Sequence, residues 1–450
     1  MGIYQKIYQN YIFPTFETYK GRDTANIYAN VHKSQWNSLE EHREKQIISL
    51  KNLLHYAQEN SPYYRQVFAD CGFFPGQLAS LGDYFRIPIL TKDLIRQNFD
   101  NLVCGPYRST LWRKSTGGST GQPLHFGYTK ESYEWRVAMS KRGYSWAGAS
   151  PGTKQAYIWG VQLGDVSYRQ KIKEQIHHFI DRQKFFNCFK FYEAGMKACL
   201  TSLNKWQPQT LIGYTNPLYE FALFVESVGG LNFTPQSVLC AAERVHSFQR
   251  KVLERVFGCP VFNTYGSREF MLIASECEKH EGLHVSMENL IVEVVDDDDM
   301  PVDPGEVGRI LVTDLHNYGM PFIRYEIGDL ARVSDRQCSC GRGLMLLDDI
   351  VGRSLDIIHT PEGKTVPGEF FPHLMKDFPE IYRFQIIQQE IDSLDVKYVK
   401  KEGAAQELPR KLNDEIRAVV GPSMKINYLA LDEIPLTPSG KHRVTVSNLP

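Results

Sequence analysis

The sequence contains no apolar run long enough to cross a bilayer and no excess of charge of either sign. Its 450 residues include 51 lysines and arginines against 52 aspartates and glutamates, which gives a formal net charge of −1 at pH 7. A chain with this balance offers a polyanion no large basic surface, so we expect no nucleic-acid partner. A spanning helix needs about 20 consecutive apolar residues, so we also expect no membrane span.

Signals of secretion, lipidation and a disulfide framework are absent as well. No continuous apolar segment follows the first six residues, and Lys6 stands where an N-myristoylation motif has Ser or Thr. Nine cysteines are an odd number spread along a long chain, unlike the pattern of a disulfide-rich secreted protein. We therefore expect a cytoplasmic protein. The oligomeric state is open at this point.

The length and the order of apolar segments predict an α/β protein with two domains of unequal size. A chain of 450 residues exceeds what one hydrophobic core usually supports. Short apolar runs alternate with helical stretches in 238–242, 246–257 and 261–265, which predicts α/β layers, and hairpins follow from about residue 283. We predict a large N-terminal α/β domain of layered sheets over 1–351, with a helical lead-in over 1–90, and a small α+β domain over 352–450.

A loop rich in glycine and hydroxyl side chains is the most informative segment. It consists of Ser115, Thr116, Gly117, Gly118, Ser119, Thr120, Gly121, Gln122 and Pro123. Its backbone N–H groups can converge on anionic oxygens, and the hydroxyls add donors. No Gly-Lys-Ser/Thr follows, so the loop is not of the Walker type. Taken alone, it could equally be a surface loop.

Four further motifs follow this loop in a fixed order. They are Tyr-Gly-Ser-Arg-Glu at 265–269, Tyr-Glu-Ile-Gly-Asp at 325–329, Gly-Arg-Ser-Leu-Asp at 352–356 and Pro-Ser-Gly-Lys at 438–441. The ordered set resembles the adenylate-forming ligase superfamily. Within it, the chain is most similar to the branch of phenylacetate–CoA ligase, coenzyme F390 synthetase and CapK-type proteins, from about residue 30 to the C-terminus.

The resemblance implies an enzyme that joins a carboxylic acid to the α-phosphate of ATP and releases pyrophosphate. The loop at 115–121 would hold the phosphates, Glu269 would bind Mg²⁺, and Asp329 would accept hydrogen bonds from the ribose hydroxyls. Arg353 would reach the ribose or a phosphate. Tyr265 would lie against the adenine, which Ala241, Ala242 and Glu243 would wall, and Gly266 and Ser267 would also contact the nucleotide.

Lys441 is the residue that the resemblance marks most sharply. A flexible ammonium can bridge the carboxylate of the acid and the α-phosphate as charge develops. In the family this lysine lies on the small C-terminal domain, which enters the site for adenylation and then rotates about a hinge for acyl transfer.

The chain departs from the family pattern at the hinge and just after it. Leu355 stands where the first acid of Gly-Arg-x-Asp-Asp belongs, and the segment 359–368 does not match the thiol-facing loop of CoA-forming members. We therefore expect a second nucleophile that is CoA or an amine, with the amine preferred. AMP transfer to a hydroxyl acceptor, or a non-catalytic nucleotide-binding scaffold, are the alternatives. Trp159, Tyr214 and Tyr219 are aromatic candidates for the acid pocket.

Two cysteine motifs predict a structural zinc site apart from this chemistry. Cys277 and His280 form a Cys-x-x-His pair, and Cys338 and Cys340 form a Cys-x-Cys pair about sixty residues later. Three sulfurs and one imidazole make a tetrahedral set.

The segment 168–192 combines basic and aromatic residues. Such a helix can lie on an anionic membrane surface, but it more often packs its aromatic rings inward and leaves the cations in water. We expect the second arrangement, with peripheral membrane binding as the weaker possibility.

Overall fold

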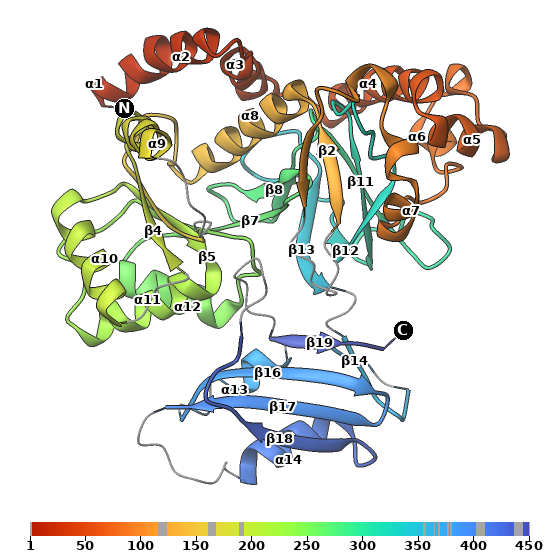
Figure 1. Cartoon of the computed structure of the whole chain (residues 1–450). Coiled ribbons are helices and arrows are strands. Elements are labelled where there is room, and N and C mark those ends of the chain that lie inside the picture. Colours follow the sequence, from red (N-terminus) through yellow and green to blue (C-terminus); the bar gives the residue numbers. More distant parts are fainter. Residues whose placement is uncertain are drawn as a thin grey trace. The chain divides into compact units, whose positions relative to one another are not determined.

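The computed structural model of the chain describes most of its residues in detail (Figure 1). These are 2–115, 124–160, 168–188, 193–353, 357–363, 365–367, 370–375, 378, 380–401, 410–435 and 444–449. They group into two compact units. The first covers residues up to Ile350 except Gly328–Leu330, and the second contains those three residues and the chain from Val351. The domain limits of 1–351 and 352–450 stay a prediction.

Helices form the whole N-terminal part of the first unit. They are α1 (Ile3–Ile7), η1 (Tyr8–Ile12), α2 (Phe13–Tyr19), α3 (Thr24–Ser34), α4 (Leu39–Asn60), α5 (Pro62–Asp70), η2 (Pro75–Gln77), α6 (Leu81–Tyr84), α7 (Lys92–Leu102) and η3 (Gly105–Tyr107). Helix α4 starts at a capping box in which Ser38 and Glu41 exchange hydrogen bonds. Its buried residues Leu50, Leu54 and Ala57 recur at helical spacing, so one face of α4 packs on the core.

The strands of the first unit make a small hairpin and one large sheet. They are β1 (Trp112–Ser115), β2 (His125–Tyr128), β3 (Gln155–Trp159), β4 (Gln183–Asn187), β5 (Thr210–Tyr214), β6 (Ser237–Ala241), β7 (Val261–Ser267), β8 (Met271–Glu276), β9 (Leu283–Val285), β10 (Leu290–Val295), β11 (Val307–Asp314), β12 (Tyr325–Val333) and β13 (Leu346–Arg353). The large sheet has the order β10-β11-β12-β13-β9-β8-β7-β6-β5-β3-β4.

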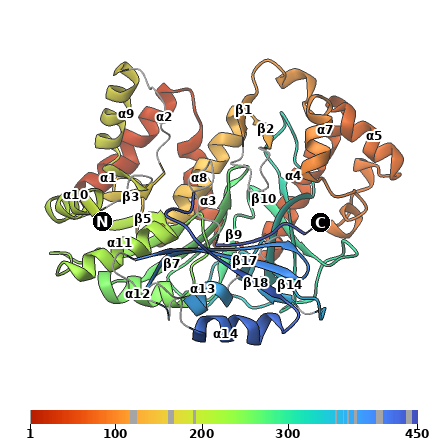
Figure 2. The same ribbon diagram turned by 60° about the horizontal axis from the view of Figure 1, so that its bottom comes forward.

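The direction of the strands changes at β7. Strands β4, β3, β5, β6 and β7 are parallel neighbours, whereas β7–β8, β8–β9 and β9–β13 are antiparallel. Parallel strands need crossover helices, and these are α9 (Tyr168–Ile180), α10 (Glu193–Trp206), α11 (Thr215–Ser227) and α12 (Ser247–Phe257), whereas α8 (Lys130–Trp146) leads from the hairpin into β3. The turned view shows the same helices flanking the sheet (Figure 2).

The central parallel strands β5 and β6 are buried on both faces. Leu211 and Val238 pack on one side with α10, α11 and α12, whereas Ile212 and Leu239 pack on the other side near Ala147 at the end of α8. Successive residues of a strand point to opposite faces, so this alternation explains why the strands are continuously apolar.

The second unit is an α+β layer built on four strands. Its elements are β14 (Ile357–His359), β15 (Thr365–Pro367), α13 (Phe370–Met375), β16 (Ile381–Glu390), β17 (Ser393–Lys400), α14 (Arg410–Val420), β18 (Lys425–Ala430) and β19 (Thr445–Ser447). The sheet order is β18-β17-β16-β19. Leu412, Ile416 and Val420 of α14 recur every four residues and pack on Leu394 and Val396 of β17.

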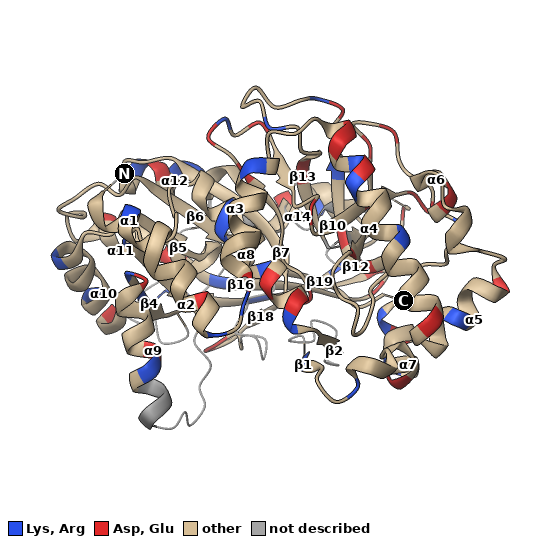
Figure 3. Ribbon diagram, turned by 90° about the horizontal axis from the view of Figure 1, so that it is seen from above, with Lys and Arg blue, Asp and Glu red and all other residues tan. Residues whose placement is uncertain are grey.

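These two units confirm the predicted fold class, an α/β protein with a large sheet domain and a smaller α+β domain. Acidic and basic residues of the described part are intermixed over most elements, in keeping with the small net charge (Figure 3). Among the helices that the structure describes, none combines the length and apolar character that a membrane crossing requires.

Candidate functional site

Three of the predicted site residues lie at the carboxyl ends of neighbouring parallel strands. Trp159 ends β3, Tyr214 ends β5 and Ala241 ends β6, and Tyr214 is paired with Ala241 in the sheet. The carboxyl ends of parallel strands share one edge, and open α/β sheets bind their ligands at that edge. The sheet therefore gathers these residues at the place where a ligand is expected.

The segment after β6 is fixed against the start of α11. Ala242 has a φ of +67°, a left-handed conformation that turns the chain away from the strand. The Glu243 carboxylate accepts a 2.8 Å hydrogen bond from the backbone N–H of Asn216, and the Thr215 hydroxyl donates to the Glu243 carbonyl at 2.9 Å. These bonds hold the predicted adenine wall, 241–243, in one conformation.

The Tyr-Gly-Ser-Arg-Glu motif lies at the carboxyl end of β7, with Arg268 and Glu269 in the turn that follows the strand. The Thr264 hydroxyl donates to the Cys240 carbonyl at 2.8 Å and ties β7 to β6, and the Tyr265 ring is buried. A Cβ atom on Gly266 would lie 1.9 Å from the Met271 carbonyl oxygen, so glycine is required there. The Ser267 hydroxyl accepts the N–H of Phe270 at 3.3 Å and closes the turn after the strand.

The predicted magnesium ligand, Glu269, is buried and held by a residue of another strand. Glu269 is only 5% exposed, and the Tyr325 hydroxyl donates a hydrogen bond to its Oε1 at 3.1 Å. Because Tyr325 opens β12, this bond joins two motifs that are 56 residues apart. It fixes one carboxylate oxygen and so orients the second.

Arg324, which the sequence analysis did not single out, positions Tyr325. Its guanidinium is buried and donates to Glu293 Oε1 at 3.0 Å, to the Ile87 carbonyl at 2.8 Å and to the Asp299 carbonyl at 3.0 Å. Its position directly before the motif at 325–329 was the only signal in the sequence.

Only the first residue of the glycine-rich loop lies in the described part of the chain. The carbonyl of Ser115 accepts a 2.9 Å hydrogen bond from the Arg268 guanidinium, which brings the start of the loop to the motif on β7. Thr116, Gly117, Gly118, Ser119, Thr120 and Gly121 lie outside the described residues, as does Lys441.

The two predicted ribose contacts are placed only by their strands. Asp329 lies on β12, four residues after Tyr325. Arg353 ends β13, and its side chain lies outside the described part of the structure. Both roles stay predictions.

The structure brings two of the three aromatic candidates for the acid pocket together. The rings of Trp159 and Tyr214 are 4.6 Å apart, whereas Tyr219 packs edge-on against Phe248 of α12 at 5.7 Å. Burial raises the pKa of Tyr214 to about 12, so its hydroxyl stays protonated at neutral pH and can donate a hydrogen bond. Trp159 and Tyr214 are therefore the better placed pair.

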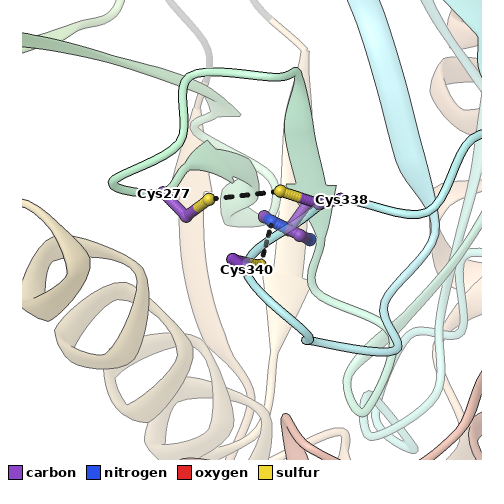
Figure 4. A group of neighbouring side chains, drawn as sticks. Cys277, Cys338 and Cys340 are labelled. Carbon is purple, nitrogen blue, oxygen red and sulfur yellow. Dashed lines mark hydrogen bonds between the residues drawn. The ribbon is translucent and has the colours of Figure 1, made fainter.

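Three cysteines and one histidine converge beside β9 (Figure 4). Cys277 follows β8, and Cys338 and Cys340 lie in the loop before β13. The fourth member is His284 of β9, and the ligand atoms of the four residues all lie within 4.8 Å of one another. The distance is 3.6 Å between the sulfurs of Cys277 and Cys338, and 3.4 Å between Cys340 Sγ and His284 Nε2.

The cluster contains His284 and not His280, the histidine predicted from the sequence. His280 has a φ of +54°, and its Nδ1 lies 3.3 Å from Glu276 Oε2 while its ring packs on Phe262. His284 is buried in the sheet, paired with Ser275 of β8 and Leu346 of β13. Burial, together with the charges of Arg342 and Arg142, lowers the pKa of His284 to about 4, so this imidazole is neutral at pH 7.

Backbone N–H groups support two of the cluster sulfurs. The N–H of Lys279 points to Cys277 Sγ at 3.5 Å, and the N–H of Arg342 points to Cys340 Sγ at 3.4 Å. Gly341, with a φ of +85°, makes the turn that allows the second contact. Such contacts stabilise thiolate character, which a metal site needs.

Comparisons with known proteins identify relatives that span nearly the whole chain. The protein named CapK of Staphylococcus aureus is 23% identical over 435 residues, which cover 96% of this chain and 94% of CapK. The phenylacetate–coenzyme A ligase of Thermus thermophilus is 25% identical over 429 residues, which cover 88% of this chain and 94% of that enzyme.

The fold and the C-terminal residues are matched as well. The crystal structure of 2-hydroxyisobutyryl-CoA ligase in the postadenylation state has a TM-score of 0.72 at 22% identity, with 92% of this chain and 90% of that chain covered. Residues 358–448 match the model of the CapK C-terminal domain. The predicted resemblance to the CapK and phenylacetate–CoA ligase branch of the adenylate-forming ligases is thus confirmed, and the chain shares the fold of 2-hydroxyisobutyryl-CoA ligase.

Proposed function

We propose that the protein activates a carboxylic acid with ATP, forms an acyl-adenylate and passes the acyl group to a second nucleophile. The observation that carries the proposal is Glu269, a buried carboxylate held by Tyr325 beside the strand ends that bear Tyr265 and Ala241. A buried carboxyl group is costly to keep unless it has a use, so this position favours a role in ligand binding or catalysis. The names of the relatives support the same reaction class.

The reaction has two steps. A carboxylate oxygen of the acid attacks the α-phosphorus of ATP, and the bond to the bridging oxygen breaks with release of pyrophosphate. The acceptor then attacks the carbonyl carbon, loses a proton and displaces AMP, which keeps the oxygen that came from the acid. The first step needs charge neutralisation at the α-phosphate, and the second needs access for the acceptor.

Glu269 fits the requirement of a Mg²⁺ ligand. It is a carboxylate, its Oε1 is fixed by Tyr325, and a hard cation prefers oxygen ligands of this type. When bound with ATP, Mg²⁺ would neutralise phosphate charge. The role of this chain's residues is to orient the carboxylate and to keep it from turning away.

The acceptor is the open part of the proposal. The relatives named CoA ligases support CoA, whereas Leu355 and the segment 359–368 of this sequence favour an amine. AMP transfer to a hydroxyl group is the alternative. The cytoplasmic location predicted from the sequence belongs to the same proposal.

We predict that Glu269→Gln lowers the rate of acid-dependent ATP–pyrophosphate exchange by about a hundredfold or more, because an electrostatic contact to the transition state is lost. Tyr325→Phe keeps the carboxylate but frees it, so its effect is expected mainly as a weaker apparent affinity for MgATP, about tenfold. Steady-state exchange at varied MgATP separates the two. Equal exchange rates for wild-type protein and folded Glu269→Gln would contradict the proposal.

A second prediction concerns Lys441. Lys441→Ala is expected to abolish acyl-adenylate formation, a loss of about 3–4 kcal/mol of transition-state stabilisation, and to leave transfer from a supplied acyl-adenylate largely intact. Lys425→Ala is the matched control, since Lys425 is an exposed lysine of β18 paired with Asp392 at 3.2 Å. Both half-reactions falling together in a folded Lys441→Ala protein would show that the lysine does not serve adenylation alone.

The acceptor is tested by offering one activated acid CoA and a set of amines side by side, with mass spectrometry of the products. Amide formation in excess of thioester is the outcome that the hinge and the segment 359–368 predict. Rapid, saturable thioester formation without amide would instead establish a CoA ligase and show that the departures at Leu355 and 359–368 do not set the acceptor.

We further propose that Cys277, His284, Cys338 and Cys340 hold a structural zinc ion. Zn–S bonds of about 2.3 Å and Zn–N bonds of about 2.0 Å in a tetrahedron place two sulfurs about 3.8 Å apart and a sulfur and nitrogen about 3.5 Å apart. The distances of 3.6 and 3.4 Å between these side chains fit those edges. The ion would join β9 to the segments after β8 and before β13.

Zinc is expected at one ion per chain in protein purified without a His-tag or added metal. His284→Ala and Cys338→Ser should lose the ion and lower the melting temperature, whereas His280→Ala should keep it, because His280 lies outside the cluster. Elemental analysis with thermal unfolding provides both readouts. Metal-free protein of full stability, or loss of zinc through His280→Ala with retention in His284→Ala, would contradict the site.

A further inference from the structure

The N-terminal helices of the first unit expose a row of large apolar side chains. Ile3 is 81% exposed, Ile7 44% and Tyr11 69%, and they follow one another every four residues through α1 and η1. Side chains at this spacing lie on one side of a helix. None of the three contributes to a core cluster of the described residues.

Helix α9 exposes a second row. Ile172 is 40% exposed, Ile176 56% and Phe179 82%, at spacings of four and three residues that define one helix face. The expectation that the aromatic rings of 168–192 pack inward is correct for Phe185, which stacks on Tyr157 at 4.5 Å. It is wrong for Phe179, whose ring lies in solvent.

Contacts of Tyr4 and Tyr8 hold α1 and η1 against the C-terminal end of α9. The Tyr4 hydroxyl donates to the Ile180 carbonyl at 2.7 Å, and the Tyr8 hydroxyl donates to the Asp181 carboxylate at 2.5 Å. The guanidinium of Arg182 lies 3.9 Å from the centre of the Tyr4 ring. The two rows are therefore held near each other at the C-terminal end of α9, and we name the exposed residues Ile3, Ile7, Tyr11, Ile172, Ile176 and Phe179 the apolar patch.

Basic residues accompany the apolar patch although the whole chain has a net charge of −1. Among the residues whose side chains the structure describes, Lys173 is exposed on α9, Arg182 lies against the Tyr4 ring between the two rows, and Lys6 is exposed within the first row. The stretch 168–185 has two acids. One of them, Asp181, is buried and accepts the Tyr8 hydroxyl, which leaves Glu174 as its exposed acid.

We propose that the apolar patch binds the surface of a membrane that contains anionic lipids. Apolar and aromatic side chains of an interfacial helix enter the boundary between headgroups and acyl chains, and neighbouring cations pair with anionic headgroups. A second copy of the chain fits the patch less well, since a twofold contact would set the same cations against one another. The proposal does not rest on the ligase reaction.

The test is sedimentation of the full chain with vesicles. We expect the chain to bind vesicles of phosphatidylglycerol and phosphatidylcholine in equal parts, and to bind vesicles of phosphatidylcholine alone only weakly. Binding to the anionic vesicles should fall as the salt concentration is raised. Ile176→Ser combined with Phe179→Ser should weaken binding about tenfold or more, because two apolar side chains no longer leave water. Lys173→Glu should weaken it as well.

Ile48→Ser is the matched control, because Ile48 is 63% exposed on α4, away from the patch in sequence. It should bind vesicles like the wild-type chain, and circular dichroism should show every variant folded. The proposal is overturned if the wild-type chain ignores anionic vesicles or if the double variant binds them equally well. It is also overturned if the wild-type chain dimerises without vesicles and the double variant does not, since the occupant is then a second copy.

Discussion

The buried guanidinium of Arg324 joins the parts of the first unit on which the candidate site depends. It contacts Glu293 of β10, the carbonyl of Asp299 in the following turn and the carbonyl of Ile87 in the helical lead-in. Its own backbone is left-handed, with a φ of +50°, and its N–H donates to the Thr313 hydroxyl at 2.8 Å. Removing one member of such a buried set typically costs about 3–5 kcal/mol.

The next residue shows why this set bears on chemistry. Tyr325 follows Arg324 directly, and its hydroxyl holds the Glu269 carboxylate. The proposed Mg²⁺ ligand therefore depends, through Tyr325, on the buried guanidinium of Arg324. The helical lead-in then has a physical role, since the carbonyl of Ile87 and the bond from the Leu90 N–H to the Arg324 carbonyl, 3.0 Å, fix the start of β12.

Features set by local sequence were predictable, and features set by long-range pairing were not. The apolar runs that end at Ala241 and precede Tyr265 predicted strands of α/β layers, and the structure shows that these strands are parallel. Parallel strands bring their carboxyl ends to one edge of the sheet. His280 was chosen because Cys-x-x-His is a common ligand spacing, yet the pairing of β8 with β9 places His284 beside the cysteines. Arg324 gave no periodic or compositional signal, because its partners lie up to 239 residues away.

The central claim, acyl-adenylate formation, is tested most directly by following an oxygen atom. A substrate acid labelled with ¹⁸O in its carboxylate is incubated with ATP, Mg²⁺ and an acceptor, and the nucleotide and phosphate products are examined by mass spectrometry. Adenylation transfers one labelled oxygen to AMP and none to pyrophosphate. Unlabelled AMP, or label in orthophosphate, would contradict the account, since the first means that the carboxylate never attacked the α-phosphorus and the second means an acyl phosphate.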